Sequence, residues 1–281
     1  MKELKYDEIG SWSGIKLDII KDYASAYTKI MAAQKSPTFK YIYIDAFAGA
    51  GQHISRDTRA LVPGSPLNAL NLDVPFQEYH FIDLNDLKIA ELEKIAKVRK
   101  DVFIYNGDCN KILPSQVLPL IDYSKYRRAL CILDPYGLHL NWEIIETAGR
   151  MKSIEIFLNF PVMDINMNVL KHDINKTAPE QIERMNAFWG DDSWRGVAYK
   201  KSKQQQLFGE ESDEKSTNKE LELGFRNRLK EIGGFENVPE PMPMRNSNNA
   251  IVYYLYFASQ RPVSASIVKD IFKKYSVWRN V

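Results

Sequence analysis

Hydrophobic and polar positions follow two periods that alternate along the chain up to residue 160. The helical period comes first, because apolar residues recur every three or four positions and predict a helix over residues 13–34. Residues 41–44 then alternate aromatic and β-branched side chains, which is typical of a strand. The positions expected to pack this first helix on a sheet are Ile20, Tyr23, Tyr27 and Ile30.

Four more apolar runs predict strands, at residues 79–83, 102–105, 129–133 and 154–160. The run at 129–133 is continuously apolar, as expected of a strand buried on both faces. Residues 52–62 are polar and predict a loop. Two short signals predict helix starts between the strands: Ser65 as a cap before Pro66, and Asn85 as a cap before a helix that turns Leu87, Ala90 and Ile95 inward.

The alternation breaks after Pro161. Residues 164–176 and 180–190 look helical and polar, whereas residues 200–215 are charged and glutamine-rich and predict a mobile loop. Thr217 and Glu220 form a plausible capping box for a helix with Leu221, Phe225, Leu229 and Ile232 inward. Strands are then predicted at 238–244 and 251–257 around the turn Asn246–Asn249, and a short basic helix at 264–275.

This order of elements predicts an α/β protein with the class I methyltransferase type of Rossmann fold. We expect a seven-stranded, mostly parallel sheet that ends in an antiparallel hairpin. A single domain would cover residues 1–281, with 161–215 as a helical or loop insertion after the fifth strand and 264–281 as a basic C-terminal tail. The position of the hairpin distinguishes this fold from that of a dehydrogenase.

Composition narrows the possible partners. The 281 residues carry a net charge of +2, so a nucleic acid would have to bind through a local basic patch.

The two cysteines, Cys109 and Cys131, are too few for a disulfide framework, which favours a cytoplasmic location. The N-terminus lacks the apolar core of a signal peptide, and no run is long enough to cross a membrane. No ligand spacing among cysteines and histidines emerges, so we expect no metal site.

Acidic residues end the first four predicted strands: Asp45, Asp83, Asp108 and Asp134. The first is followed by a glycine turn at Gly49 and Gly51, which lets a nucleotide-like ligand approach the backbone. Asp83 is positioned to accept hydrogen bonds from ribose hydroxyls, and Asp108 to lie near an adenine amine, with the backbone after it near the ring. The alternative for each acid is a helix N-cap, which is common after a strand.

The sharpest motif is Asp134-Pro135-Tyr136-Gly137. Enzymes that methylate exocyclic amines of bases carry an acid or amide, two prolines and an aromatic residue at this place. The acidic oxygen and a carbonyl orient the amine, while the aromatic ring stacks on the extruded base. This chain has one proline instead of two, so its aromatic residue comes one position early. The alternative is a turn with a buried tyrosine.

Several of these motifs together resemble the three-Cys-motif partner protein (TcmP) family. They are Asp45-Ala-Phe-Ala-Gly-Ala-Gly51, Phe81-Ile-Asp83, Gly107-Asp-Cys-Asn110, Leu133-Asp-Pro-Tyr-Gly137, Leu158-Asn-Phe-Pro161, Trp12-Ser-Gly-Ile-Lys16 and Tyr253-Tyr-Leu-Tyr-Phe257. The resemblance implies an S-adenosylmethionine-type fold and a partner protein, encoded nearby, with three cysteines similar to radical-type iron–sulfur enzymes. The motif at Asp134 is also similar to that of tRNA guanine-amine dimethyltransferases. The segments at Asp45 and Asp83 are similar to those of adenine-amine DNA methyltransferases.

These observations predict an S-adenosylmethionine-dependent methyltransferase that acts on an amine of a nucleic-acid base. The expected catalytic residues are Asp134, Pro135 and Tyr136, and the expected cofactor-binding residues are Asp45, Phe47, Gly49, Gly51, Asp83, Asp108 and Cys109. One alternative is a non-catalytic, cofactor-binding subunit of the three-cysteine partner. Another is a nicotinamide-dependent oxidoreductase, which ranks last because Ile54 replaces the third fingerprint glycine.

Two surface features have weaker meanings. Residues Gln204–Phe208 resemble the pentapeptide with which bacterial proteins bind the replication sliding clamp, a short pattern that also arises by chance. Lys269, Lys273, Lys274 and Arg279 make a basic tail that could contact phosphates, although a solvated amphipathic helix is the favoured interpretation.

Overall fold

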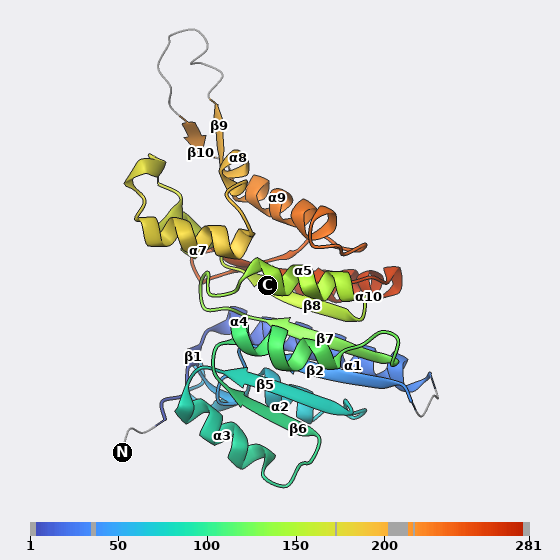
Figure 1. Ribbon diagram of the computed structural model, residues 1–281. Helices are drawn as coiled ribbons and strands as arrows, with labels where there is room; N and C mark the ends of the chain where they lie inside the picture. Colours follow the sequence, from blue (N-terminus) through green and yellow to red (C-terminus); the bar gives the residue numbers. More distant parts are fainter. Residues whose placement is uncertain (1–3, 35–37, 172, 202–212, 216, 278–281) are drawn as a thin grey trace, which may run out of the picture.

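Seven strands form the central sheet of the computed structural model, which describes residues 4–34, 38–171, 173–201, 213–215 and 217–277 (Figure 1). Their order across the sheet is β11-β12-β8-β7-β2-β5-β6. Strand β12 runs in the direction opposite to the other six. This arrangement confirms the predicted fold class, including the antiparallel terminal hairpin. The strands are β2 (Lys40–Asp45), β5 (Glu78–Asp83), β6 (Val102–Asn106), β7 (Arg127–Leu133), β8 (Ile154–Phe160), β11 (Met242–Arg245) and β12 (Ile251–Ala258).

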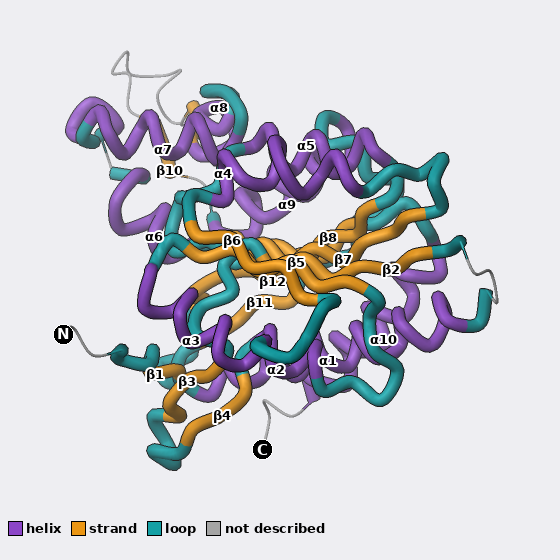
Figure 2. Tube along the Cα trace, turned by 60° about the horizontal axis from the view of Figure 1, so that its bottom comes forward, coloured by secondary structure: helices purple, strands orange, loops and turns teal. Residues whose placement is uncertain are grey.

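Helices cover both faces of the sheet, because successive strand residues point to opposite sides and both sets are apolar (Figure 2). Tyr41 and Tyr43 of β2 pack toward α1 (Ser11–Ala32), α2 (Ser65–Leu70), α3 (Asp86–Ala96) and α10 (Pro262–Val277). Ile42 and Ile44 pack toward the other layer, formed by α4 (Cys109–Ile112), η1 (Leu113–Val117), η2 (Leu118–Leu120), α5 (Trp142–Met151) and α9 (Asn218–Glu231).

The helix starts agree only in part with the prediction. Asn85 caps α3 as expected, since its side chain accepts hydrogen bonds from the N–H groups of Leu87 and Lys88. The buried positions of α3 are Ile89, Leu92 and Ala96; of the predicted inward residues, Leu87 and Ile95 are partly buried, whereas Ala90 is exposed and its prediction was wrong. At α2, Gly64 is the N-cap and Ser65 already belongs to the helix, one residue earlier than predicted.

The predicted loop at 52–62 was wrong. Two short strands, β3 (Gln52–Ser55) and β4 (Leu61–Pro63), pair antiparallel, and β1 (Glu8–Ile9) pairs parallel with β3. This small sheet escaped prediction because its strands are short and partly exposed, and because β1 comes from a distant part of the sequence. Ion pairs from Lys88 to Asp7 and from Arg59 to Glu8, at 2.6 and 2.7 Å, hold the N-terminal segment across the edge of the central sheet.

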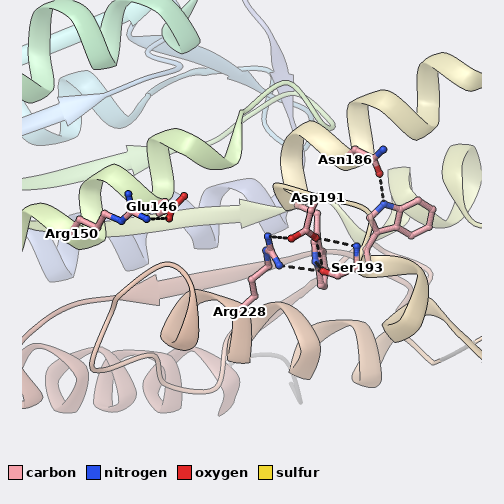
Figure 3. A network of polar contacts seen from close by, with 8 residues as sticks. Glu146, Arg150, Asn186, Asp191, Ser193 and Arg228 are labelled. Atoms are coloured by element: carbon pink, nitrogen blue, oxygen red, sulfur yellow. Dashed lines mark hydrogen bonds and ion pairs between the residues drawn. The ribbon is translucent and has the colours of Figure 1, made fainter.

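The segment after β8 is largely helical, as predicted. Its elements are α6 (Val162–Asp164), η3 (Ile165–Val169), η4 (Ile174–Lys176), α7 (Pro179–Trp189) and α8 (Trp194–Ala198), followed by the antiparallel pair β9 (Tyr199–Lys201) and β10 (Asp213–Lys215). Figure 3 shows how this segment is fixed to α9: Arg228 donates to Asp191 at 2.8 Å and to Ser193 at 3.2 Å. The suggested clamp-binding residues 204–208 lie outside the described residues.

The C-terminal elements return to the N-terminal helix. The capping box of Thr217 and Glu220 is present, but β11 begins at Met242 and is shorter than predicted. Helix α10 packs on α1, where Lys274 and Tyr275 bind the Asp22 carboxylate at 2.8 and 3.0 Å. Two predicted core positions near helix ends, Ile30 and Ile232, are exposed instead. Among the described residues, no helix is long and apolar enough to cross a membrane.

Candidate functional site

The carboxyl ends of the parallel strands bring four acidic residues to one edge of the sheet. Asp45 and Asp83 are the last residues of β2 and β5, Asp134 directly follows β7, and Asp108 follows β6 by two positions. Because these strands pair in parallel, the acids lie along one edge in the order Asp134, Asp45, Asp83, Asp108. The structure therefore brings together the four acids on which the sequence prediction relied.

The glycine turn after β2 is anchored to the next strand. Gly49 donates its N–H to Oδ2 of Asp83 at 2.8 Å, and Ala48 donates to the carbonyl of Ile82 at 2.9 Å. Gly49 and Gly51 have φ angles of +63° and +80°, a region that other residues rarely adopt. The turn thus keeps a side-chain-free stretch of backbone beside a carboxylate.

Asp45 lies fully buried beneath this turn. Its Oδ1 accepts the N–H of Phe47 at 3.2 Å, whereas Oδ2 forms no hydrogen bond with the described residues. Burial raises the pKa of Asp45 to about 7, although the nearby Ser65 hydroxyl and the Phe47 N–H oppose this shift. The carboxyl group is therefore an unusual buried acid at the centre of the edge.

Asp108 caps a helix, and Cys109 packs in the hydrophobic core. Oδ1 of Asp108 accepts the N–H of Asn110 at 2.9 Å and caps α4, so the N-cap alternative applies to this acid. Cys109 packs in the core of the α4 and α5 layer, and burial raises the pKa of its thiol to about 12. The amide of Asn110 also binds the backbone of His139 and Asn141, which ties α4 to the loop after Asp134.

A cavity of about 830 Å³ opens at this edge. Its floor holds Phe47, Ala48 and the Asp134–Gly137 motif, and its walls come from the N-terminal segment, α1, α6 and α7. The volume is within the usual range for ligand sites. Gly49, Asp83 and Asp108 lie beside the cavity, further along the edge toward β6.

Lys16 of α1 and Asp134 form an ion pair inside this cavity. Burial alone would lower the pKa of Lys16, but the carboxylate of Asp134 and the nearby Tyr253 raise it above its ordinary value. Lys16 is therefore charged at neutral pH, and it uses one carboxylate oxygen of Asp134. Oδ1 of Asp134 accepts no hydrogen bond from the described residues, and the side chain remains about one third exposed.

Tyr136 projects from the cavity floor and is 91% exposed, so the alternative of a buried turn tyrosine was wrong. Pro135 before it is buried, which fixes the direction of the motif. Gly137 has a φ of +62°, and a Cβ there would lie 3.1 Å from both Arg184 Nη2 and Asp164 Oδ2. A glycine is thus needed where α6 and α7 approach the motif.

Four further residues that line the cavity have buried polar atoms without a hydrogen bond to any described residue. These atoms are His53 Nδ1, Asn159 Oδ1, Asp164 Oδ2 and Arg184 Nε. Buried polar atoms usually find partners, so the donors and acceptors around this cavity are available to a polar ligand or to water. Burial lowers the pKa of His53, which keeps its ring neutral at pH 7.

Sequence reasoning missed most of these residues. Lys16 had a signal, because it lies on the buried stripe of α1 with Ile20, Tyr23 and Tyr27, where a lysine is unusual. His53, Asn159, Asp164 and Arg184 carried no such signal, since separate elements bring them together. The described residues contain no cluster of three or more potential metal ligands.

Comparisons with known proteins found similar solved structures. No protein-family model matches this sequence, and no curated protein matches it. The protein LPL1258 from Legionella pneumophila, of the family model DUF519, has a similar structure with a TM-score of 0.50 and 14% identity, covering 92% of this chain and 91% of that one. A putative S-adenosylmethionine-dependent methyltransferase from Listeria monocytogenes has a TM-score of 0.39 and 13% identity, covering 85% of this chain and 99% of that one.

Proposed function

We propose that this chain is an S-adenosylmethionine-dependent methyltransferase that modifies an exocyclic amine of a nucleic-acid base. The observation that carries the proposal is the edge of the sheet, where a glycine turn and Asp83 adjoin a cavity floored by Asp134 and the exposed ring of Tyr136. The sheet order supports it, since this edge is where open α/β sheets bind ligands.

The residues around the glycine turn fit the cofactor. Asp83 offers carboxylate oxygens beside the open backbone of Gly49, which suits ribose hydroxyls, and buried Asp45 orders the turn through the Phe47 N–H. Phe47 and Ala48 connect this turn to the cavity, so a cofactor held by the turn would reach toward Asp134. When bound, S-adenosylmethionine supplies a methyl group on a positively charged sulfur.

The residues of the cavity suit a flat amine-bearing substrate. Oδ1 of Asp134 can accept a hydrogen bond from the amine, and Tyr136 offers an aromatic face on which a base can stack. Lys16 binds one oxygen of Asp134 and fixes the orientation of its carboxylate. The cations Arg56 and Arg184 at the cavity suit the phosphates of a nucleic acid.

A second function fits one observation. Lys16 occupies one oxygen of Asp134, an arrangement that also suits a subunit that binds the cofactor without catalysing a reaction. In that case the chain would serve the three-cysteine partner that its TcmP-like motifs imply.

The net charge of +2 gives little electrostatic attraction for nucleic acid, so we further propose that the partner supplies part of substrate binding, with residues 161–215 as the contact.

The deciding experiment is incubation with labelled methyl donor and mixed DNA and RNA, with and without the three-cysteine protein. Label transfer that requires Asp134 supports the enzyme. Cofactor binding and partner association without transfer support the binding subunit, and full activity of the isolated chain refutes dependence on the partner. Calorimetry that detects a nicotinamide dinucleotide but neither S-adenosylmethionine nor its demethylated product refutes both functions.

A further inference from the structure

A second cavity of about 340 Å³ lies at the opposite, amino edge of the sheet. It is bounded by the starts of β7 and β8, represented by Arg128 and by Ile154 with Glu155, and by the C-terminal half of α1 and the start of α10. None of its lining residues belongs to the candidate active site. The proposed methyltransferase chemistry therefore gives this cavity no role.

The floor of this amino-edge cavity contains an organised set of polar groups. Glu155 is buried, and its two oxygens accept hydrogen bonds from the hydroxyls of Tyr23 and Ser264. These bonds leave the carboxyl group satisfied. Burial raises the pKa of Glu155, and the Ser264 and Tyr23 hydroxyls oppose that shift.

Two other polar groups of the cavity are not satisfied. The hydroxyl of Tyr27 is buried and forms no hydrogen bond with the described residues. The amide of Gln260 donates from Nε2 to the carbonyls of Gly149 and Gly234 at 2.9 and 2.8 Å, which fixes its orientation. Its buried Oε1 is left without a described partner. A ligand with a hydroxyl or amide group could satisfy both atoms.

The rim of the cavity is positively charged. Arg128, Lys152 and Arg261 line it, and none of them forms an ion pair with a carboxylate of the residues that the structure describes. Arg128 stacks on the ring of Tyr123 at 3.6 Å, and Arg261 donates to the Tyr123 hydroxyl at 3.1 Å, so both guanidinium groups are held in position. Fixed, unpaired cations beside a cavity attract an anion.

The walls between rim and floor are apolar, with Ile30, Met31, Phe39, Val263 and Ile267. We propose that this amino-edge cavity is a binding site for a small organic carboxylate with an aromatic or branched apolar body. Its anionic group would meet Arg128 and Arg261, its body would fill the apolar walls, and a polar substituent would reach Tyr27. The proposal does not depend on the reaction at the opposite edge.

The test uses the full chain and four probes: phenylacetate, 4-hydroxyphenylacetate, 2-phenylethanol and phenethylamine. Two-dimensional NMR should show saturable shifts of the backbone amides of Ser153, Ile154 and Ser264 with the two carboxylates. Affinity for the neutral and cationic probes should be at least about tenfold weaker, because they forgo charge-assisted hydrogen bonds.

Three variants locate the interaction. Arg261→Gln should weaken carboxylate binding about tenfold. The wild type should prefer 4-hydroxyphenylacetate to phenylacetate because the extra hydroxyl reaches Tyr27, and Tyr27→Phe should remove this preference. Lys97→Gln removes an exposed cation just after α3, away from this cavity, and should leave binding unchanged. The proposal is overturned if neither carboxylate shifts these amides at about 10 mM, a weak-binding limit. It is also overturned if all four probes bind equally or if Arg261→Gln has no effect.

Discussion

The ammonium group of Lys16 and the carboxylate of Asp134 form an ion pair that joins helix α1 to the end of strand β7. Both groups line the cavity at the carboxyl edge of the sheet, yet Lys16 is buried while Asp134 remains about one third exposed. The pair therefore links a buried cation, which needs a partner, to a carboxylate that is still accessible to a ligand.

Breaking this pair from the acidic side should reveal its structural contribution. Asp134→Asn leaves Lys16 buried without a counter-charge and should lower the free energy of unfolding by about 1–3 kcal/mol. The double variant Lys16→Met/Asp134→Asn should recover part of this loss, because it removes the buried charge. Urea denaturation of Asp134→Asn, of Lys16→Met and of the double variant measures the coupling between the two residues. Strictly additive changes in the free energy of unfolding would show that the two residues do not interact.

Asp134→Ala should also abolish methyl transfer while leaving cofactor affinity nearly unchanged. The reason is that Asp134 lies in the cavity, apart from the glycine turn and Asp83. Labelled methyl transfer and calorimetry with S-adenosylmethionine give the two readouts. Equal loss of cofactor binding would assign Asp134 to the cofactor site instead.

Asp83→Ala should weaken cofactor binding by about 1.5–3 kcal/mol, because it removes a charged acceptor next to Gly49. A suitable control is Asp86→Ala, which removes an exposed acid of α3 that binds Asn106. Calorimetry on both variants checks the difference. If the control weakens binding as much as Asp83→Ala, a general charge effect explains the result.

Tyr136→Ala should impair substrate binding and leave cofactor binding intact, since the ring is 91% exposed at the cavity. Stacking of a base on an aromatic ring contributes about 1–3 kcal/mol, so KM should rise about tenfold or more. Tyr136→Phe keeps the ring and should behave like the wild type. A large effect of Tyr136→Phe would assign the function to the hydroxyl.

Stability should depend on the protonation of Asp45, whose pKa burial raises to about 7 from an ordinary value of 3.8. Between these values the folded state holds a proton that the unfolded state has lost, so stability falls as the pH rises from about 4 to about 7. The loss should be on the order of 3 kcal/mol between pH 5 and pH 8. Asp45→Asn should remove this slope, as urea denaturation at both pH values can test, and an unchanged slope would contradict the assignment.

The sheet was largely predictable from sequence because its strands are mostly apolar runs, four of which end at or near an acid. The motif at Asp134 was equally visible, since its residues are adjacent in the chain. The cavity was not, because His53, Asp164 and Arg184 come from separate elements whose contact depends on the tertiary fold. The small sheet of β1, β3 and β4 was missed because short strands take their stability from pairing and not from their own residue pattern.

The position of strand β12 has a consequence for how the chain folds during synthesis. The outer edge of β8 pairs with residues 254–258 of β12, and α10, at residues 262–277, packs on α1. Until these late residues leave the ribosome, the nascent chain presents an open strand edge and an uncovered apolar helix face. Such long-range pairing slows folding and exposes intermediates to aggregation, so the synthesis of residues 251–277 is the step that lets this sheet and its helical cover be completed.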